Sequence, residues 1–199
     1  MIVKVWRRVR KLPSHLFRRC LRRAFHFDRW HITALSERKY ARDIIAHVNA
    51  RPAERRGALV EIGCGLGDII SNARYARRLG LDREPNVLRA AAFLARAKCK
   101  GRIEWGVFEF PRAELEGRYD VIVLVNWIHH VRPDVLKAWV ADYMNGHLAD
   151  GGEIILDTVR DADYEYNHSI EHLTDALACR VERLGQYERQ REVFAIGKA

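Results

Sequence analysis

Three alternating glycines constrain this chain more than any other feature. Gly63, Gly65 and Gly67 lie in the stretch LVEIGCGLGDII, residues 59–70. The apolar residues before them predict a short strand, and residues 68–76 predict a helix. Glycine tolerates positive φ and lets a backbone approach a ligand without a Cβ in the way. A strand, a glycine turn and a helix N-terminus together form a cradle for a nucleotide-like ligand.

One acid, Glu61, lies just before the glycines. A carboxylate at this position argues against a bare phosphate site and suits a ligand with a cationic end. The stretch resembles motif I of class I S-adenosylmethionine-dependent methyltransferases, in which an acid precedes GxGxG at the end of the first strand. The resemblance implies that S-adenosyl-L-methionine is the cofactor. It also implies that Glu61, the three glycines and the intervening Cys64 bind it.

The next two expected strands bear on the rest of the cofactor site. Asp82 ends the stretch RRLGLD and is followed by Arg83. Methyltransferases of this family carry an acid here, which accepts hydrogen bonds from the ribose hydroxyls. After the third strand, over residues 102–108, the family usually has an Asp for the adenine amine. This chain has Val107 at that position, followed by Phe108, which we expect against the base.

The second informative stretch is an apolar run, VIVLV, that ends in NWIHH. A continuous apolar run is typical of a central parallel strand buried on both faces. The stretch resembles motif IV of the small-molecule methyltransferases and lacks the NPPY-type pattern of enzymes that methylate nucleic-acid amines. The resemblance implies that Asn126 and Trp127 lie beside the sulfonium. His129 and His130 are candidate general bases, because histidine titrates near neutral pH.

Two other segments supply candidates for the acceptor site. An aromatic N-terminal segment contains Trp30, His31 and Tyr40. In this family such a segment often covers the cofactor, and His31 is a third candidate base. The loop expected after the fifth strand is rich in tyrosine and histidine. Its candidates are Tyr164, Tyr166 and His168. For both segments a purely structural role is the alternative.

The order of these elements predicts the fold. Residues 133–146 are expected to form a helix, and a Gly-Gly turn feeds a fifth strand. Residues 180–187 and 191–197 alternate in polarity and predict a hairpin. The resemblance implies an α/β doubly wound, mostly parallel seven-stranded sheet with a terminal antiparallel hairpin and an N-terminal helical extension. We expect residues 1–35 to form a basic amphipathic extension and residues 36–199 the S-adenosylmethionine-binding domain.

The charge of the chain is concentrated at its N-terminus. The formal net charge is +9, with 35 Lys and Arg against 26 Asp and Glu. Residues 1–27 hold nine of the basic residues and no acid. This basic arm, residues 1–24, has apolar residues at helical spacing. It fits a helix packed on the domain, a membrane-surface helix or a non-specific nucleic-acid contact.

Composition narrows the cellular setting. No apolar run reaches the length of a membrane span and no signal peptide is recognisable, so we expect a cytoplasmic protein with possible membrane association through the arm. The four cysteines show no CxxC spacing, and no metal site is expected.

Taken together, the motifs predict an enzyme that transfers a methyl group from S-adenosylmethionine to a hydroxyl or amine. The acceptor is expected to be a small molecule, a lipid-linked compound or a saccharide. Two alternatives remain open: an RNA methyltransferase that uses the basic arm, and a cofactor-binding protein without chemistry of its own. A nicotinamide oxidoreductase is disfavoured, because GxGxG replaces GxGxxG.

Overall fold

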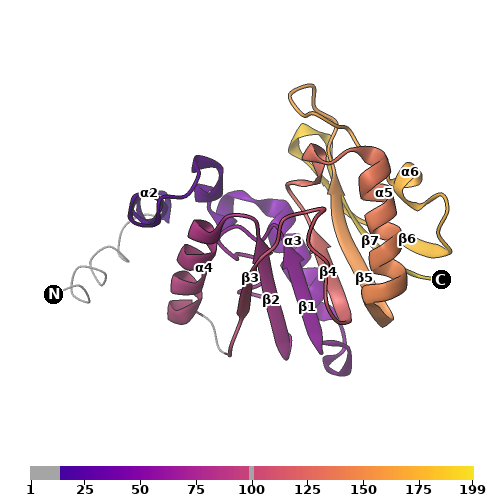
Figure 1. Ribbon diagram of the computed structural model, residues 1–199, viewed down its shortest axis with the longest axis horizontal. Coiled ribbons are helices and arrows are strands. Elements are labelled where there is room, and N and C mark those ends of the chain that lie inside the picture. The colour runs from indigo at the N-terminus through magenta and orange to yellow at the C-terminus, as the bar shows by residue number, and fades with distance from the viewer. Residues whose placement is uncertain (1–13, 99–100) are drawn as a thin grey trace.

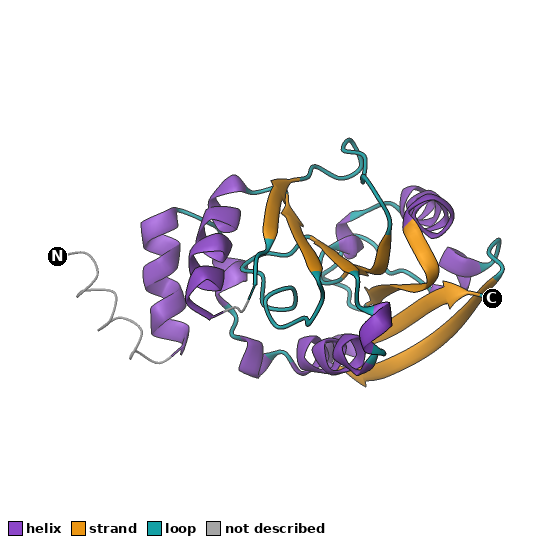
Figure 2. Ribbon diagram, turned by 90° about the horizontal axis from the view of Figure 1, so that it is seen from below, coloured by secondary structure: helices purple, strands orange, loops and turns teal. Residues whose placement is uncertain are grey.

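The computed structural model describes residues 14–98 and 101–199, and these form a seven-stranded sheet with helices on both sides (Figures 1 and 2). The strand order is β3-β2-β1-β4-β5-β7-β6. The strands are β1 Ala58–Ile62, β2 Arg77–Asp82, β3 Glu104–Val107, β4 Tyr119–Leu124, β5 Leu148–Thr158, β6 Cys179–Tyr187 and β7 Arg191–Lys198. The predicted doubly wound fold is confirmed.

Strands β1 to β5 pair in parallel, and the terminal hairpin runs antiparallel to β5 through β7. The order of the strands reverses between β1 and β4, because the chain first builds outward to β3 and then returns to the other side of β1. In open α/β sheets, ligands bind outside the carboxyl ends of the strands at such a switch point. The topology therefore predicts a ligand-binding site among the residues that follow β1, β2 and β4.

Helices cover both faces of the sheet. The α-helices are α2 Ser14–Phe25, α3 Lys39–Ala50, α4 Pro85–Lys98, α5 Pro133–Asp142 and α6 Ile170–Thr174. The short helical turns are η1 Arg29–Ile32, η2 Leu35–Glu37, η3 Ala53–Arg55, η4 Ile128–His130, η5 Tyr143–His147 and η6 Glu188–Gln190. Successive side chains of a strand point to opposite faces. In β4, Ile122 accordingly packs in the core on the α5 side and Val123 in the core on the α3 side.

Helix α2 packs on α4 at one end of the molecule (Figure 1). Leu21 is fully buried in a cluster with Val87, Ala90 and Leu94 of α4. Among the alternatives for the basic arm, packing on the domain therefore describes α2, while arm residues 1–13 lie outside the described residues. In the described ranges, no helix is both long and apolar enough to cross a membrane.

Two sequence-based expectations about helices are wrong. The helix expected over residues 68–76 is replaced by turns, because Asn72 uses its side chain to bond the Asp68 carbonyl and Asn49 accepts a hydrogen bond from the Arg74 amide. Such side-chain bonds compete with the helical ladder. The helix expected over residues 133–146 ends at Asp142 and continues as the π-helical turn η5.

Candidate active site

The glycine loop after β1 depends on backbone conformations that other residues rarely adopt. Gly63, Gly65 and Gly67 have φ values of +74°, +53° and +70°. Neighbouring side chains also leave no room for a Cβ at these positions. A Cβ on Gly63 would lie 2.3 Å from Cδ1 of Trp127, and the indole N–H of Trp127 donates to the Ile62 carbonyl at 2.6 Å. The loop therefore holds its shape only with glycine at these positions.

Two more rings lie against this loop. A Cβ on Gly65 would lie 2.9 Å from Nδ1 of His31, and one on Gly67 would lie 2.6 Å from Cη2 of Trp105 in β3. His31 also places Nε2 3.3 Å from Oε2 of Glu84. Burial lowers the pKa of His31, so its ring is neutral at neutral pH. His31 was predicted from the sequence, whereas Trp105 was not, because no sequence feature separates it from an ordinary core aromatic.

Asp82 connects β2 to the glycine loop. Its carboxylate is buried, with 5% of the residue exposed. Oδ2 accepts a hydrogen bond from the Gly65 amide at 2.8 Å, and Oδ1 accepts one from the Glu84 amide at 3.0 Å. The predicted ribose acid therefore lies beside the predicted methionine loop, fixed by two backbone donors. Arg83, the next residue, is exposed.

Glu61 and Cys64 are both buried beneath the loop. Glu61 accepts a hydrogen bond from the Ile70 amide at 2.8 Å, and burial raises its pKa to about 8. Glu61 therefore ties β1 to the turn that follows the glycines. Burial also raises the pKa of the Cys64 thiol well above its usual value, so Cys64 is a protonated packing residue.

The adenine end of the predicted site is formed by the end of β3. Val107 is 61% exposed, whereas Phe108 is 5% exposed and belongs to the core cluster that contains Leu81 and Leu115. The Phe108 amide donates to the Asp82 carbonyl at 3.0 Å, which holds the end of β3 against β2. In this structure Val107 is the accessible side chain, and the ring of Phe108 packs into the core.

A polar network that contains a buried ion pair lies at the carboxyl ends of β4 and β5, and only part of it was predicted from the sequence. Asn126 has a φ of +70°, and its amide donates to Oδ1 of Asp157 at 2.8 Å. Arg191 forms an ion pair with Asp157 and donates to Oδ1 of Asn126 at 3.1 Å. Its guanidinium also lies 4.7 Å from the ring centre of Tyr40.

Asp157 and Arg191 are 1% and 7% exposed, so this pair is almost fully withdrawn from water. One sequence feature indicated this pair. Asp157 lies near the end of a buried apolar strand, and a buried acid requires a partner. No local pattern pointed to Arg191, which lies in the terminal hairpin. The pair holds Asn126 in a left-handed conformation that non-glycine residues rarely adopt.

Next to this network, the turn after β4 forms a cluster of rings. The centre of the His129 ring lies 4.3 Å from that of His130 and 4.0 Å from that of Tyr164. Burial, aided by the neighbouring positive groups His130 and Arg191, lowers the pKa of His129 to about 4. Nδ1 of His129 is buried and has no hydrogen-bond partner within the described part of the chain. His129 is thus a neutral imidazole with a free nitrogen.

The loop after β5 folds back onto the same turn. The Tyr166 amide donates to the His129 carbonyl at 3.1 Å. The buried His168 has its Nε2 2.9 Å from the Ile128 carbonyl, and burial lowers its pKa. The structure therefore brings together the candidates predicted on these two segments. Tyr166 contributes its backbone amide, His168 a ring nitrogen and Tyr164 its ring.

The N-terminal candidates divide between the two halves of the site. His31 lies on the glycine loop rather than beside His129 and His130, while Tyr40 lies under Arg191. Trp30 is 65% exposed, with its ring tilted against that of His31 at 6.0 Å. Of these three side chains, Tyr40 is the one that reaches the polar network beside the β4 turn.

Comparisons with known proteins agree with this geometry. Residues 60–154 match a family model described as a methyltransferase domain. The matched segment begins in β1 and extends into β5, so it contains the glycine loop, Asp82 and the β4 turn. No curated protein sequence matches the chain significantly.

Solved structures share the fold at low sequence identity. N-methyltransferase NodS from Bradyrhizobium japonicum WM9, in complex with S-adenosyl-L-homocysteine, is 18% identical with a TM-score of 0.68, over 92% of this chain and 97% of that one. Magnesium protoporphyrin IX methyltransferase from Synechocystis PCC 6803 is 13% identical with a TM-score of 0.66, over 90% and 93%. CalS10, an amino pentose methyltransferase from Micromonospora echinaspora, is 14% identical with a TM-score of 0.61, over 100% and 97%.

The fold is that of class I S-adenosylmethionine-dependent methyltransferases, and residues 60–154, just under half of the chain, match a methyltransferase domain. Solved structures with this fold bind S-adenosyl-L-homocysteine or S-adenosyl-L-methionine. The residues at the switch point fit that cofactor. Gly65 leaves room where a Cβ would meet His31, and Asp82 supplies a fixed carboxylate at the end of β2. Among the described residues, no cluster of side chains suits a metal ion.

Proposed function

We propose that the protein methylates an amine or hydroxyl of a small-molecule acceptor bound at the carboxyl ends of β4 and β5. The observation that carries the proposal is the contact between the β4 turn and the loop after β5. Through it, His129, His130 and Tyr164 form one cluster a few residues from Asn126. A ring-lined wall with a neutral imidazole suits a compact organic acceptor better than an extended polymer.

In this mechanism the cofactor supplies an already activated methyl group. The protein's part is to align the acceptor with that methyl group and to exclude water. Such positioning can lower a reaction barrier by roughly 7–11 kcal/mol. Gly63, Gly65 and Gly67 would admit the amino-acid end of the cofactor, and Asp82 would hold its ribose. The network of Asn126, Asp157 and Arg191 would fix the backbone that separates the cofactor from the acceptor.

His129 would accept the proton that the acceptor loses. A group with a pKa of about 4 is almost entirely unprotonated at neutral pH and can accept the proton that a hydroxyl loses as the methyl transfers, whereas a neutral amine attacks through its own lone pair and needs no base in that step. His130 is the alternative base, since it is adjacent and exposed. NodS is an N-methyltransferase and CalS10 acts on an amino pentose, so amines, including amino sugars, are the first acceptors to test.

The test is a screen of amines, hydroxyl compounds, saccharides and RNA oligonucleotides, using S-adenosylmethionine labelled in its methyl group. We expect label in a small molecule and S-adenosylhomocysteine as the second product. Label in RNA alone would support the RNA alternative. Cofactor binding without any turnover would support the non-catalytic one.

Substitutions then test the base. We expect His129→Asn to lower kcat by about 10²–10⁴-fold and to leave the affinity for the cofactor unchanged. The matched control is His172→Asn, an exposed histidine in α6, which should leave kcat unchanged. Full activity of His129→Asn, with loss of activity in His130→Asn, would transfer the role to His130.

A further inference from the structure

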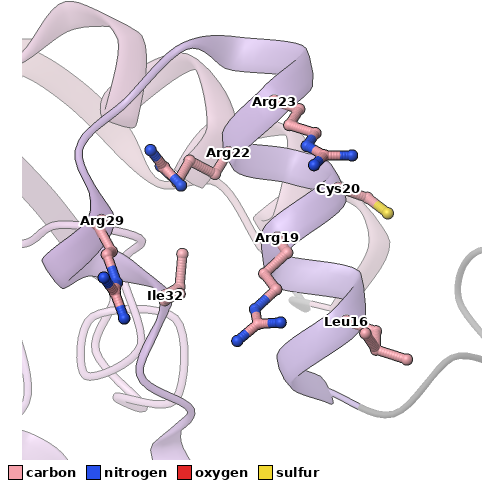
Figure 3. A pocket seen from close by; sticks show the side chains of 7 residues that line it. All are labelled: Leu16, Arg19, Cys20, Arg22, Arg23, Arg29 and Ile32. Carbon is pink, nitrogen blue, oxygen red and sulfur yellow. The ribbon is translucent and has the colours of Figure 1, made fainter.

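A groove between α2 and η1 is lined by four arginines and by apolar side chains (Figure 3). Its volume is about 590 Å³. The lining residues are Leu16, Arg19, Cys20, Arg22, Arg23, Arg29 and Ile32. They come from α2 and η1. The proposed methyl transfer gives none of these seven side chains a role.

The arginines of α2 face two different environments. Arg18 is buried, donates to the Thr33 carbonyl at 2.9 Å and forms an ion pair with Asp68 at 2.7 Å. Arg19, Arg22 and Arg23 are exposed. The side chains of these three arginines and of Arg29 form no hydrogen bond or ion pair with any described residue. Arg18 therefore fixes α2 to the domain. The other four arginines place their guanidinium groups on the groove.

Charge near the groove is almost entirely of one sign. Between residues 14 and 33 the chain has a single acid, Asp28, against five arginines. Residues 1–13 add Lys4, Arg7, Arg8, Arg10 and Lys11 to the sequence and no acid. Closely spaced guanidiniums repel one another, so a surface of this composition favours an anionic partner. Guanidinium is also the side-chain group that best matches the geometry of phosphate.

Apolar side chains lie among these charges. Leu16 is 39% exposed and Ile32, which also lines the groove, is half-buried, while Trp30 of η1 is 65% exposed. Arginines interspersed with aliphatic and tryptophan side chains are typical of proteins that lie at a membrane surface. A nucleic-acid backbone would neutralise the arginines but would leave Leu16 and Ile32 exposed to water. Acyl chains at the boundary of a bilayer would bury them.

We propose that this groove docks the protein on a membrane that contains anionic phospholipids. The four arginines contact headgroup phosphates, and Leu16 and Ile32 enter the boundary between headgroups and acyl chains. Among the described residues, no hydrogen bond joins a residue of the groove to Gly63, Gly65, Gly67 or Asp82. Docking and cofactor binding are therefore separable by experiment.

The experiment is co-sedimentation of the full chain with phosphatidylcholine vesicles, with and without phosphatidylserine. We expect binding to the anionic vesicles only, and weaker binding as salt increases. The test variant replaces Arg19, Arg22, Arg23 and Arg29 with Gln. Each basic side chain near an anionic surface contributes about fivefold to the partition coefficient. Since such contributions add incompletely, we expect the variant to bind roughly 10²-fold more weakly.

The matched control replaces four exposed arginines elsewhere, Arg112, Arg118, Arg132 and Arg180, and so has the same net charge. It should bind anionic vesicles like the unmodified protein. Calorimetry with S-adenosylmethionine should give the same affinity for all three proteins, which shows that the variants are folded. Equal loss of vesicle binding in the control would overturn the proposal. So would unchanged binding in the test variant, or arginine-dependent binding to an RNA oligonucleotide with no binding to vesicles.

Discussion

The two halves of the site are built in different ways. The cofactor half consists mainly of backbone: one loop of alternating glycines and a carboxylate held by two backbone amides. The proposed acceptor half consists of side chains from distant segments. Tyr40, Asn126, Asp157 and Arg191 meet there although they are spread over most of the chain. A backbone site needs particular residues in one short stretch, whereas a side-chain site needs the whole fold to be in place.

This difference predicts how each half fails. Damage to the glycine loop should abolish cofactor binding while the fold survives, because the strain is local. Damage to the polar network should destabilise the whole protein, because a buried charge then loses its partner. The following substitutions test that contrast.

The largest effect is expected for Gly65→Arg. The position has a φ of +53°, and a Cβ there would lie 2.9 Å from His31, so any side chain is strained and enters the cradle. We expect calorimetry to detect no binding of S-adenosylmethionine. The control is Gly146→Ala, because a Cβ there meets nothing within 4 Å. Normal cofactor affinity in Gly65→Arg would refute the assignment of the loop.

Asp157→Asn should cause the largest loss of stability. It leaves Arg191 buried without its counter-charge, and breaking a buried pair in this way costs about 3–5 kcal/mol. Urea denaturation measures the change in the free energy of unfolding. Asp134→Asn, which breaks an exposed pair with Arg132, should change that free energy by less than about 1 kcal/mol. Similar losses in the two variants would show that the network is not the stabilising element proposed here.

Arg18→Gln should have a smaller effect on stability. Arg18 connects α2 to Asp68 and Thr33, but Asp68 keeps its second partner, Arg38. We expect a loss of about 1–3 kcal/mol in the free energy of unfolding, the range for hydrogen bonds to charged groups. Arg19→Gln changes the exposed neighbour and should stay within about 0.5 kcal/mol. If both substitutions have the same small effect, Arg18 does not fix α2 to the domain.

The last prediction concerns the dependence of stability on pH. The pKa of Glu61 is about 8 in the folded protein against an ordinary value of 4.5. Between these values the folded state holds more protons than the unfolded state, so this residue makes the free energy of unfolding fall as pH rises. For one proton the slope is at most about 1.4 kcal/mol per pH unit. Glu61→Gln should flatten the slope across this window. The exposed Glu182→Gln should leave it unchanged, and an unaltered slope in Glu61→Gln would contradict the high pKa.

The same contrast explains what the sequence could predict. The positions of most strands, the glycine loop and Asp82 follow from local patterns, because apolar runs and glycines act within a few residues of one another. The doubly wound arrangement was predicted from the resemblance to methyltransferases. The turns at residues 68–76 were missed because Asn49, distant in sequence, competes for the backbone there. Arg191 and Trp105 were missed because their roles depend on which strands become neighbours. The packing of Phe108 also follows from the tertiary fold, not from its position after β3.

The arrangement of rings around the glycine loop has a practical consequence. Of the five tryptophans in the chain, Trp105 and Trp127 both lie against this loop. Indole emission depends on the polarity and contacts of the ring. The protein therefore carries an intrinsic optical probe at its cofactor site, and titration with S-adenosylmethionine should change its fluorescence without any added label. Replacing Trp127 with Phe would show how much of the signal originates beside Gly63.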